Sequence, residues 1–107
     1  MIRLASVIGL PAGNVAEYER LHSAVWPKVL ERLRASHMTN YSIFRHGEML
    51  FSYLEYSGDN LDADNAAIAA DEATREWWAV CEPLQRPLPD RAPGEWWTEI
   101  PEVFHLD

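Results

Sequence analysis

Residues 40–56, NYSIFRHGEMLFSYLEY, decide the fold of this chain. The segments 40–45 and 49–56 are rich in aromatic and apolar residues, and this composition predicts two β-strands. The residues between them, 46–48, include Gly47, which adopts a positive φ without steric cost. The stretch therefore predicts a β-hairpin.

Towards the N-terminus, the sequence predicts a strand followed by two helical segments. Residues 2–8 are β-branched and apolar and fit a mostly buried strand. Asn14 is a favourable N-cap for a helix that we expect to run through Val25. Pro27 lacks a backbone donor and fits best in the first turn of a second helical segment.

Towards the C-terminus, we expect two more helices, an irregular loop and a last strand. Residues 60–70 are rich in Ala and predict a helix, and Asp71 caps a further one. Four prolines make 83–93 an irregular loop, and 102–106 predicts a short strand. The order β-α-β-β-α-β predicts an α+β, ferredoxin-like fold with a four-stranded antiparallel sheet and helices on one face.

The sheet face without helices also needs cover. The first and third predicted strands are apolar on both sides, and one chain of this length has nothing left to pack there. A second copy is the simplest cover, and we therefore expect a homodimer packed sheet to sheet.

Composition limits the classes of function. We expect residues 1–107 to form one domain, because 107 residues are typical of one hydrophobic core. The formal net charge of −8 argues against nucleic acid and against an anionic membrane surface as partners. No apolar stretch is long enough to cross a membrane, and a single cysteine, Cys81, favours a reducing compartment, so we expect a cytoplasmic protein.

The candidate chemistry begins on the first predicted helix. Tyr18, His22 and Trp26 are four residues apart and share one helix face. Histidine changes charge near neutral pH and suits proton transfer, although a partly exposed histidine beside a core tyrosine is an alternative interpretation.

Aromatic residues elsewhere suggest a ligand that is flat or has an apolar face. Adjacent residues on a helix point about 100° apart, so Trp77 and Trp78 do not share one core layer, and one of them is expected to line a surface or cavity. Two core anchors are the alternative for this pair. Tyr41 offers a hydroxyl to a ligand or occupies an ordinary strand edge. For Trp96 and Trp97 we favour packing in the core or a dimer.

Familiar cofactor and metal motifs are missing from the sequence. The chain has no glycine-rich phosphate loop, no zinc-like Cys/His spacing and no nucleophile elbow. Cys81 has no evident base beside it and is predicted to pack inertly.

Five motifs together resemble the L-rhamnose mutarotase family, in order and spacing, from Met1 to Leu106. They are Tyr18-x-x-x-His22-x-x-x-Trp26-Pro27, Asn40-Tyr41-Ser42-Ile43, Leu50-Phe51-x-Tyr53-x-Glu55, Trp77-Trp78 and Glu102-Val103-Phe104-His105-Leu106.

The resemblance implies a dimeric α+β barrel with aldose 1-epimerase activity and no cofactor or metal. It implies that the substrate is a monosaccharide, L-rhamnose or a related 6-deoxy sugar. It also implies that His22 is the proton donor and that Tyr18, Tyr41, Trp77 and Trp78 bind the sugar.

The chain departs from the family pattern at three places. Leu21 and Glu76 stand where the family usually has basic residues, and 83–90 replaces its usual Asn-Pro-Asp-Asn loop. We expect this loop to border the sugar pocket. The same fold also hosts cofactorless and haem-dependent monooxygenases, and a non-enzymatic dimeric binding module is a third interpretation.

Overall fold

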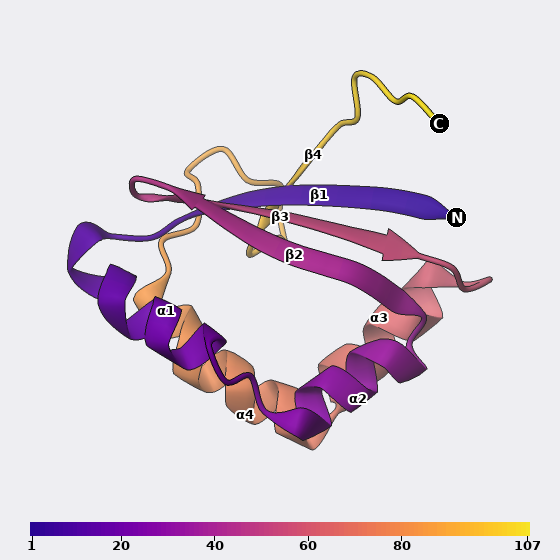
Figure 1. Ribbon diagram of the computed structural model, residues 1–107, viewed down its shortest axis with the longest axis horizontal. Helices are drawn as coiled ribbons and strands as arrows, with labels where there is room; N and C mark the ends of the chain where they lie inside the picture. The colour runs from indigo at the N-terminus through magenta and orange to yellow at the C-terminus, as the bar shows by residue number, and fades with distance from the viewer.

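The computed structural model describes residues 1–107 as one four-stranded sheet with four helices on one of its faces (Figure 1). The strand order is β2-β3-β1-β4, and neighbouring strands are antiparallel, which confirms the predicted α+β, ferredoxin-like arrangement. The elements in chain order are β1 (Ile2–Gly9), the 3₁₀ turn η1 (Ala12–Asn14), α1 (Val15–His22), α2 (Pro27–Ala35), β2 (Met38–His46), β3 (Met49–Tyr56), α3 (Leu61–Ala70), α4 (Glu72–Cys81), the 3₁₀ turn η2 (Glu82–Leu84) and β4 (Thr98–Ile100).

The central hairpin forms as the sequence predicts. His46 pairs with Met49, and Gly47 between them has a φ of 57°, the left-handed conformation that glycine adopts without strain. Near the start of β2 the pairing with β3 shifts between Thr39 and Ser42, and Asn40 there has a φ of 48°. This irregularity is a β-bulge, which changes the direction of the side chains that follow it.

The helix caps follow from the sequence only in part. Asn14 lies at the N-cap of α1, but its side chain accepts no hydrogen bond from the first turn; its Nδ2 donates instead to the carbonyl of Leu84. Asn60 accepts a hydrogen bond from the backbone N–H of Ala63 at the start of α3, and Asp71 does the same for Thr74 in α4. Pro27 is the first residue of α2, where its missing N–H has no intrahelical partner to lose.

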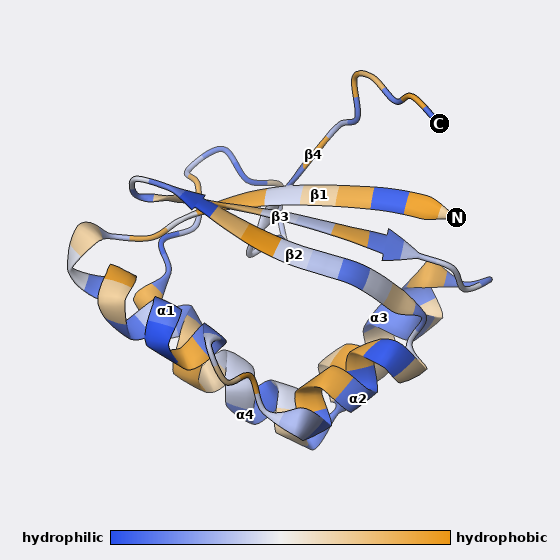
Figure 2. Ribbon diagram, viewed as in Figure 1, coloured by the Kyte–Doolittle hydropathy of each residue, from blue (hydrophilic) through white to orange (hydrophobic).

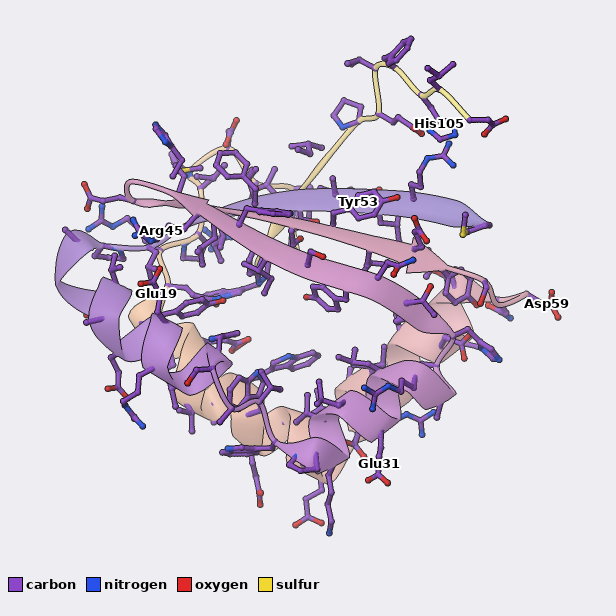
Figure 3. All side chains as sticks on the ribbon, viewed as in Figure 1. Glu19, Glu31, Arg45, Tyr53, Asp59 and His105 are labelled. Atoms are coloured by element: carbon purple, nitrogen blue, oxygen red, sulfur yellow. The ribbon has the colours of Figure 1, made fainter.

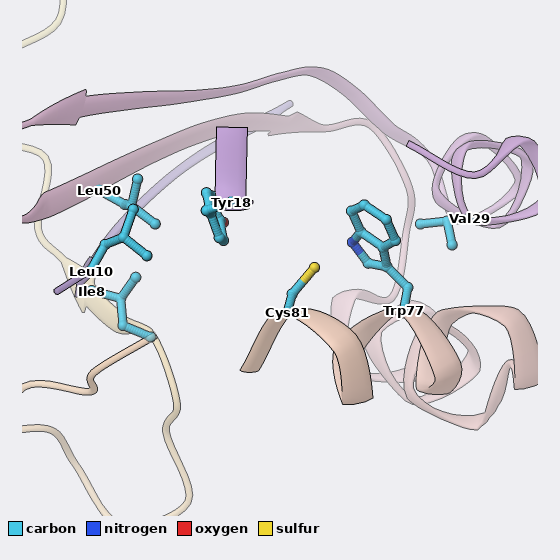
Figure 4. Close-up of a cluster of buried hydrophobic side chains, with 7 residues drawn as sticks. All are labelled: Ile8, Leu10, Tyr18, Val29, Leu50, Trp77 and Cys81. Atoms are coloured by element: carbon cyan, nitrogen blue, oxygen red, sulfur yellow. The ribbon is translucent and has the colours of Figure 1, made fainter. Parts of the chain in front are cut away.

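The main core lies between the sheet and helices α1, α2 and α4 (Figure 4). Ile8 and Leu50 face each other on β1 and β3 and are almost fully buried. The buried members of this cluster are Ile8, Leu10, Tyr18, Val29, Leu50, Trp77 and Cys81. A smaller cluster of Met38, Tyr56 and Ile68 closes the other end of the sheet.

Two predicted elements are wrong in their limits. Helix α1 ends at His22 rather than at Val25, and Ser23 caps it by donating to the carbonyl of Arg20. The last strand is at Thr98–Ile100 rather than at 102–106. Pro101 has no N–H to donate to the ladder with β1, so the strand stops before it.

The C-terminal tail and the second face of the sheet lie on the side away from the helices (Figure 1). Residues 101–107 have no regular secondary structure and are exposed. The outer sheet face carries an exposed aromatic pair: Phe44 pairs with Phe51, and Phe44 is 64% exposed. Arg3 and Glu55 pair farther along the same face. Figure 2 shows that β1 is hydrophobic along much of its length. Among the helices, none has the length and apolar character that crossing a membrane would require.

Candidate active site

A cavity of about 670 Å³ lies between the sheet and the helices, and most of its lining is apolar. That volume is typical of a small-molecule site. All five residues predicted to act on a ligand line it: Tyr18, His22, Tyr41, Trp77 and Trp78. A second hollow of about 600 Å³ between α2 and α4 is lined mainly by charged residues and has no aromatic wall, so it resembles solvated surface.

His22 is the last residue of α1, and one of its ring nitrogens is hydrogen-bonded to the backbone. Its Nδ1 lies 2.9 Å from the backbone carbonyl oxygen of Tyr18, one helical turn earlier. Since a carbonyl only accepts, Nδ1 must carry the hydrogen and donate it. In the neutral ring Nε2 therefore holds the lone pair, and it is the nitrogen left for a ligand in the cavity.

Aromatic packing fixes the orientation of the His22 ring. The ring stacks on Tyr18 with centroids 4.0 Å apart, and it meets Trp77 edge to face at 5.2 Å. Burial lowers the pKa of His22, and this effect outweighs the hydrogen bond to the Tyr18 carbonyl, which favours the charged form. At neutral pH His22 is therefore mainly an uncharged base.

The two phenols reach the cavity from different elements. Tyr18 on α1 is almost fully buried, and its hydroxyl oxygen accepts a hydrogen bond from Nε2 of Gln85 at 3.2 Å. Tyr41 lies in the bulge of β2; its side chain lines the cavity although 43% of the residue is exposed. Burial raises the pKa of both hydroxyls, so both stay protonated.

The adjacent tryptophans of α4 divide their roles as their angular separation predicts. Trp77 is 6% exposed and packs edge to face against Trp26 with centroids 5.1 Å apart. Trp78 is 38% exposed, and both indoles line the cavity. One side chain thus belongs to the core and the cavity together, and the other forms part of the cavity rim.

Three further residues line the cavity although the sequence alone does not predict them as ligand-binding residues. Trp96 and Trp97 pack against the core, as predicted, but they also line the cavity. Gln85 lines it too, so the loop 83–90 borders the pocket as expected. The only feature of the sequence that could have indicated Gln85 is its amide, since the rest of this loop is rich in proline and leucine.

Cys81 lines the same cavity without being reactive. It is buried beside Tyr18 and Trp77 in the core (Figure 4). Burial raises the pKa of its thiol to about 11, so the nucleophilic thiolate is scarce at neutral pH. This agrees with the inert packing predicted from the sequence.

The chemistry of the lining suits an uncharged polyhydroxy ligand. Glu82 is the only lining residue among aspartate, glutamate, lysine and arginine. Indoles stack on the C–H faces of sugar rings, phenols and amides hydrogen-bond hydroxyl groups, and a neutral imidazole moves protons.

Comparisons with known proteins agree on one family. A family model described as L-rhamnose mutarotase matches residues 3–106. L-rhamnose mutarotase of Opitutus terrae is 38% identical over 109 residues, covering 100% of both chains. L-fucose mutarotase of Xanthomonas campestris pv. campestris is 37% identical, covering 99% of this chain and 89% of that one. The crystal structure of L-rhamnose mutarotase from Formosa agariphila superposes with a TM-score of 0.78 at 27% identity, covering 100% of both chains.

Proposed function

The chain belongs to the L-rhamnose mutarotase family and is a sugar mutarotase, and from that premise we propose that it interconverts the α and β anomers of L-rhamnose or a related 6-deoxy sugar, with His22 moving the proton. The observation that carries this proposal is the hydrogen bond from Nδ1 of His22 to the Tyr18 carbonyl, which leaves Nε2 for the substrate. The lining of the cavity, aromatic and nearly free of charge, supports a neutral sugar.

Each anomer must open to the aldehyde and close again. In the proposed step, neutral Nε2 of His22 takes the proton from the anomeric hydroxyl, the bond between C1 and the ring oxygen breaks, and C1 becomes a carbonyl. The imidazolium then donates the same proton to the ring oxygen, which becomes a hydroxyl. Both oxygens were bonded to C1, so one nitrogen can serve both, and no net proton is consumed.

Rotation about the C1–C2 bond presents the other face of the aldehyde, and the reverse steps close the ring on that face. One positioned acid–base group contributes about 10²–10⁴-fold. Because mutarotation in water is not a slow reaction, an enhancement of this size is sufficient without a further reactive group.

The remaining cavity residues would bind and orient the sugar. Tyr41 is suited to hydrogen-bond a sugar hydroxyl, and Trp77 and Trp78 to stack on the apolar face of the ring. Burying the C6 methyl group of a 6-deoxy sugar against these indoles would contribute about 0.8 kcal/mol.

The decisive experiment measures anomer exchange of L-rhamnose by saturation-transfer NMR in His22→Asn. The asparagine amide can keep the bond to the Tyr18 carbonyl while removing the nitrogen at the Nε2 position. We expect exchange to fall to the spontaneous rate with the fold intact. His46→Asn, at the exposed end of β2, is the matched control. Exchange by His22→Asn at the wild-type rate would refute the role of His22.

We also propose that two copies pack through their outer sheet faces. The exposed pair Phe44 and Phe51, together with Ile100, supports this, because an apolar patch of this kind is typical of an interface. Phe44→Glu should shift the mass measured by light scattering from dimer to monomer; a wild-type monomer would refute the proposal. A cytoplasmic location is likewise proposed, since the lone thiol of Cys81 suits a reducing compartment.

A further inference from the structure

We propose that Gln85 is a positioning residue that turns the hydroxyl proton of Tyr18 into the cavity, so that Tyr18 donates a hydrogen bond to an oxygen of the bound sugar. The proposal rests on the proposed function, because it takes a sugar as the occupant of the cavity. It assigns a direction to a hydrogen bond that the residue types alone leave open.

The orientation of the Gln85 amide is decided by its other partner. The indole N–H of Trp96 donates to Oε1 of Gln85, with 2.7 Å between Nε1 and Oε1. An indole nitrogen cannot accept, so the amide oxygen must face Trp96 and the amide NH₂ must face the other way. On that side Nε2 lies 3.2 Å from the hydroxyl oxygen of Tyr18.

The direction of one bond then fixes the next. The amide group at Nε2 only donates, so the oxygen of Tyr18 accepts, and its own proton cannot point at Gln85. The hydroxyl has no other hydrogen bond within the protein, and Tyr18 is 3% exposed. The cavity is the space open to this proton, and a ligand oxygen there would complete a chain from Trp96 through Gln85 and Tyr18 to the sugar.

The backbone on both sides of Gln85 is fastened to the start of the chain. The carbonyl of Leu84 accepts from Nδ2 of Asn14 at 2.9 Å. Arg86 and Gly9 exchange two backbone hydrogen bonds of 2.8 Å each. A Cβ atom on Gly9 would lie 2.6 Å from the Arg86 carbonyl oxygen, so glycine is needed for this close approach. The amide of Gln85 is therefore held in place although it belongs to an irregular loop.

A purely structural role is the competing explanation, since Gln85 also ties Trp96 to α1. Two isosteric substitutions separate the roles. Gln85→Glu keeps the acceptor for Trp96 but replaces the donor that faces Tyr18 with a second acceptor. Gln85→Met removes both hydrogen bonds but leaves the phenol proton free.

The experiment measures L-rhamnose binding by tryptophan fluorescence and anomer exchange by NMR in these two variants. At pH 7.5 the carboxylate of Gln85→Glu would attract the phenol proton away from the sugar. We expect binding and exchange to fall about tenfold or more in Gln85→Glu, and less in Gln85→Met. Acidification that protonates the new carboxyl should restore part of the binding by Gln85→Glu.

A structural role predicts the opposite order, because Gln85→Glu preserves the bond to Trp96 and Gln85→Met does not. In a Tyr18→Phe background the difference between the two variants should vanish; a difference that persists there, or a larger loss in Gln85→Met, overturns the proposal. If Gln85→Glu fails to fold, a double-mutant cycle of Gln85→Met and Tyr18→Phe replaces it. Non-additive losses of binding are then expected, and additive losses overturn the proposal.

Failure of the proposed function gives a different result. A wild-type chain that binds L-rhamnose without exchanging its anomers refutes the proposed reaction, while the order of the binding constants still decides the role of Gln85. A wild-type chain that binds none of a panel of aldoses overturns both.

Discussion

The rate of anomer exchange should fall as the pH is lowered and His22 becomes protonated. Nδ1 of His22 donates to a backbone carbonyl, so neutral Nε2 is the reactive atom, and protonation removes its lone pair. Burial lowers the pKa of His22 from its ordinary value of 6.5. The neutral form is therefore nearly complete at pH 7.5. The experiment measures the rate of anomer exchange in a series of buffers from pH 8 to pH 4.5.

The magnitude follows from the titration of a single base. Above the pKa of His22 the rate should be constant, and below it the rate should fall about tenfold for each pH unit. The midpoint should lie below 6.5, since two aromatic rings desolvate the imidazole and the carbonyl bond only partly offsets them.

Saturation-transfer NMR on L-rhamnose measures the rate, after subtraction of the spontaneous exchange in the same buffers. Circular dichroism at each pH controls for unfolding. Unfolding is a relevant control because the folded chain holds the His22 proton less tightly than the unfolded chain does, so this residue costs stability as the pH falls below 6.5. A midpoint above 6.5 would contradict the lowered pKa of His22, and a rate that rises as the pH falls would make the imidazolium the reactive form.

Two further predictions concern the frame around the site. Gly9→Ala should destabilise the chain by about 1–3 kcal/mol in thermal unfolding, because the new Cβ forces apart the two backbone hydrogen bonds to Arg86. Gly13→Ala is the control and should be nearly neutral, since no atom lies within 4 Å of its Cβ. Cys81 should react slowly with iodoacetamide at pH 8, since the pKa of its thiol is raised to about 11, and quickly once guanidinium unfolds the chain; fast labelling of the native chain would contradict its burial.

The parts of the fold that the sequence predicts well are set by neighbours in the chain. Strand β3 has the predicted limits, and Gly47 makes the turn next to it, because pairing and turn chemistry act over a few residues. Asp71 caps α4 for the same reason. Strand β4 is not predictable in this way, because it depends on non-local pairing with β1 and on Pro101, which ends that pairing.

In the candidate site too, the sequence predicts the residues that are close together in the chain and not those that packing brings together. Tyr18 and His22 are predictable because one helical turn brings them together, and both line the cavity. Gln85 is 67 residues from Tyr18 and 11 from Trp96, and no local pattern links them. Their meeting depends on the bridge between Gly9 and Arg86, which exists only once β1 and the loop have packed.

The distribution of charge indicates which substrates the cavity accepts, in addition to what the aromatic residues indicate. The chain carries a formal net charge of −8, yet the cavity lining includes one carboxylate, Glu82, and no lysine or arginine. Figure 3 shows charged side chains such as Glu31 pointing away from the cavity. A phosphate group would enter this field without a cation to pair with it, and a buried unpaired charge is costly. The lining of the cavity therefore supports the uncharged sugar proposed as the substrate.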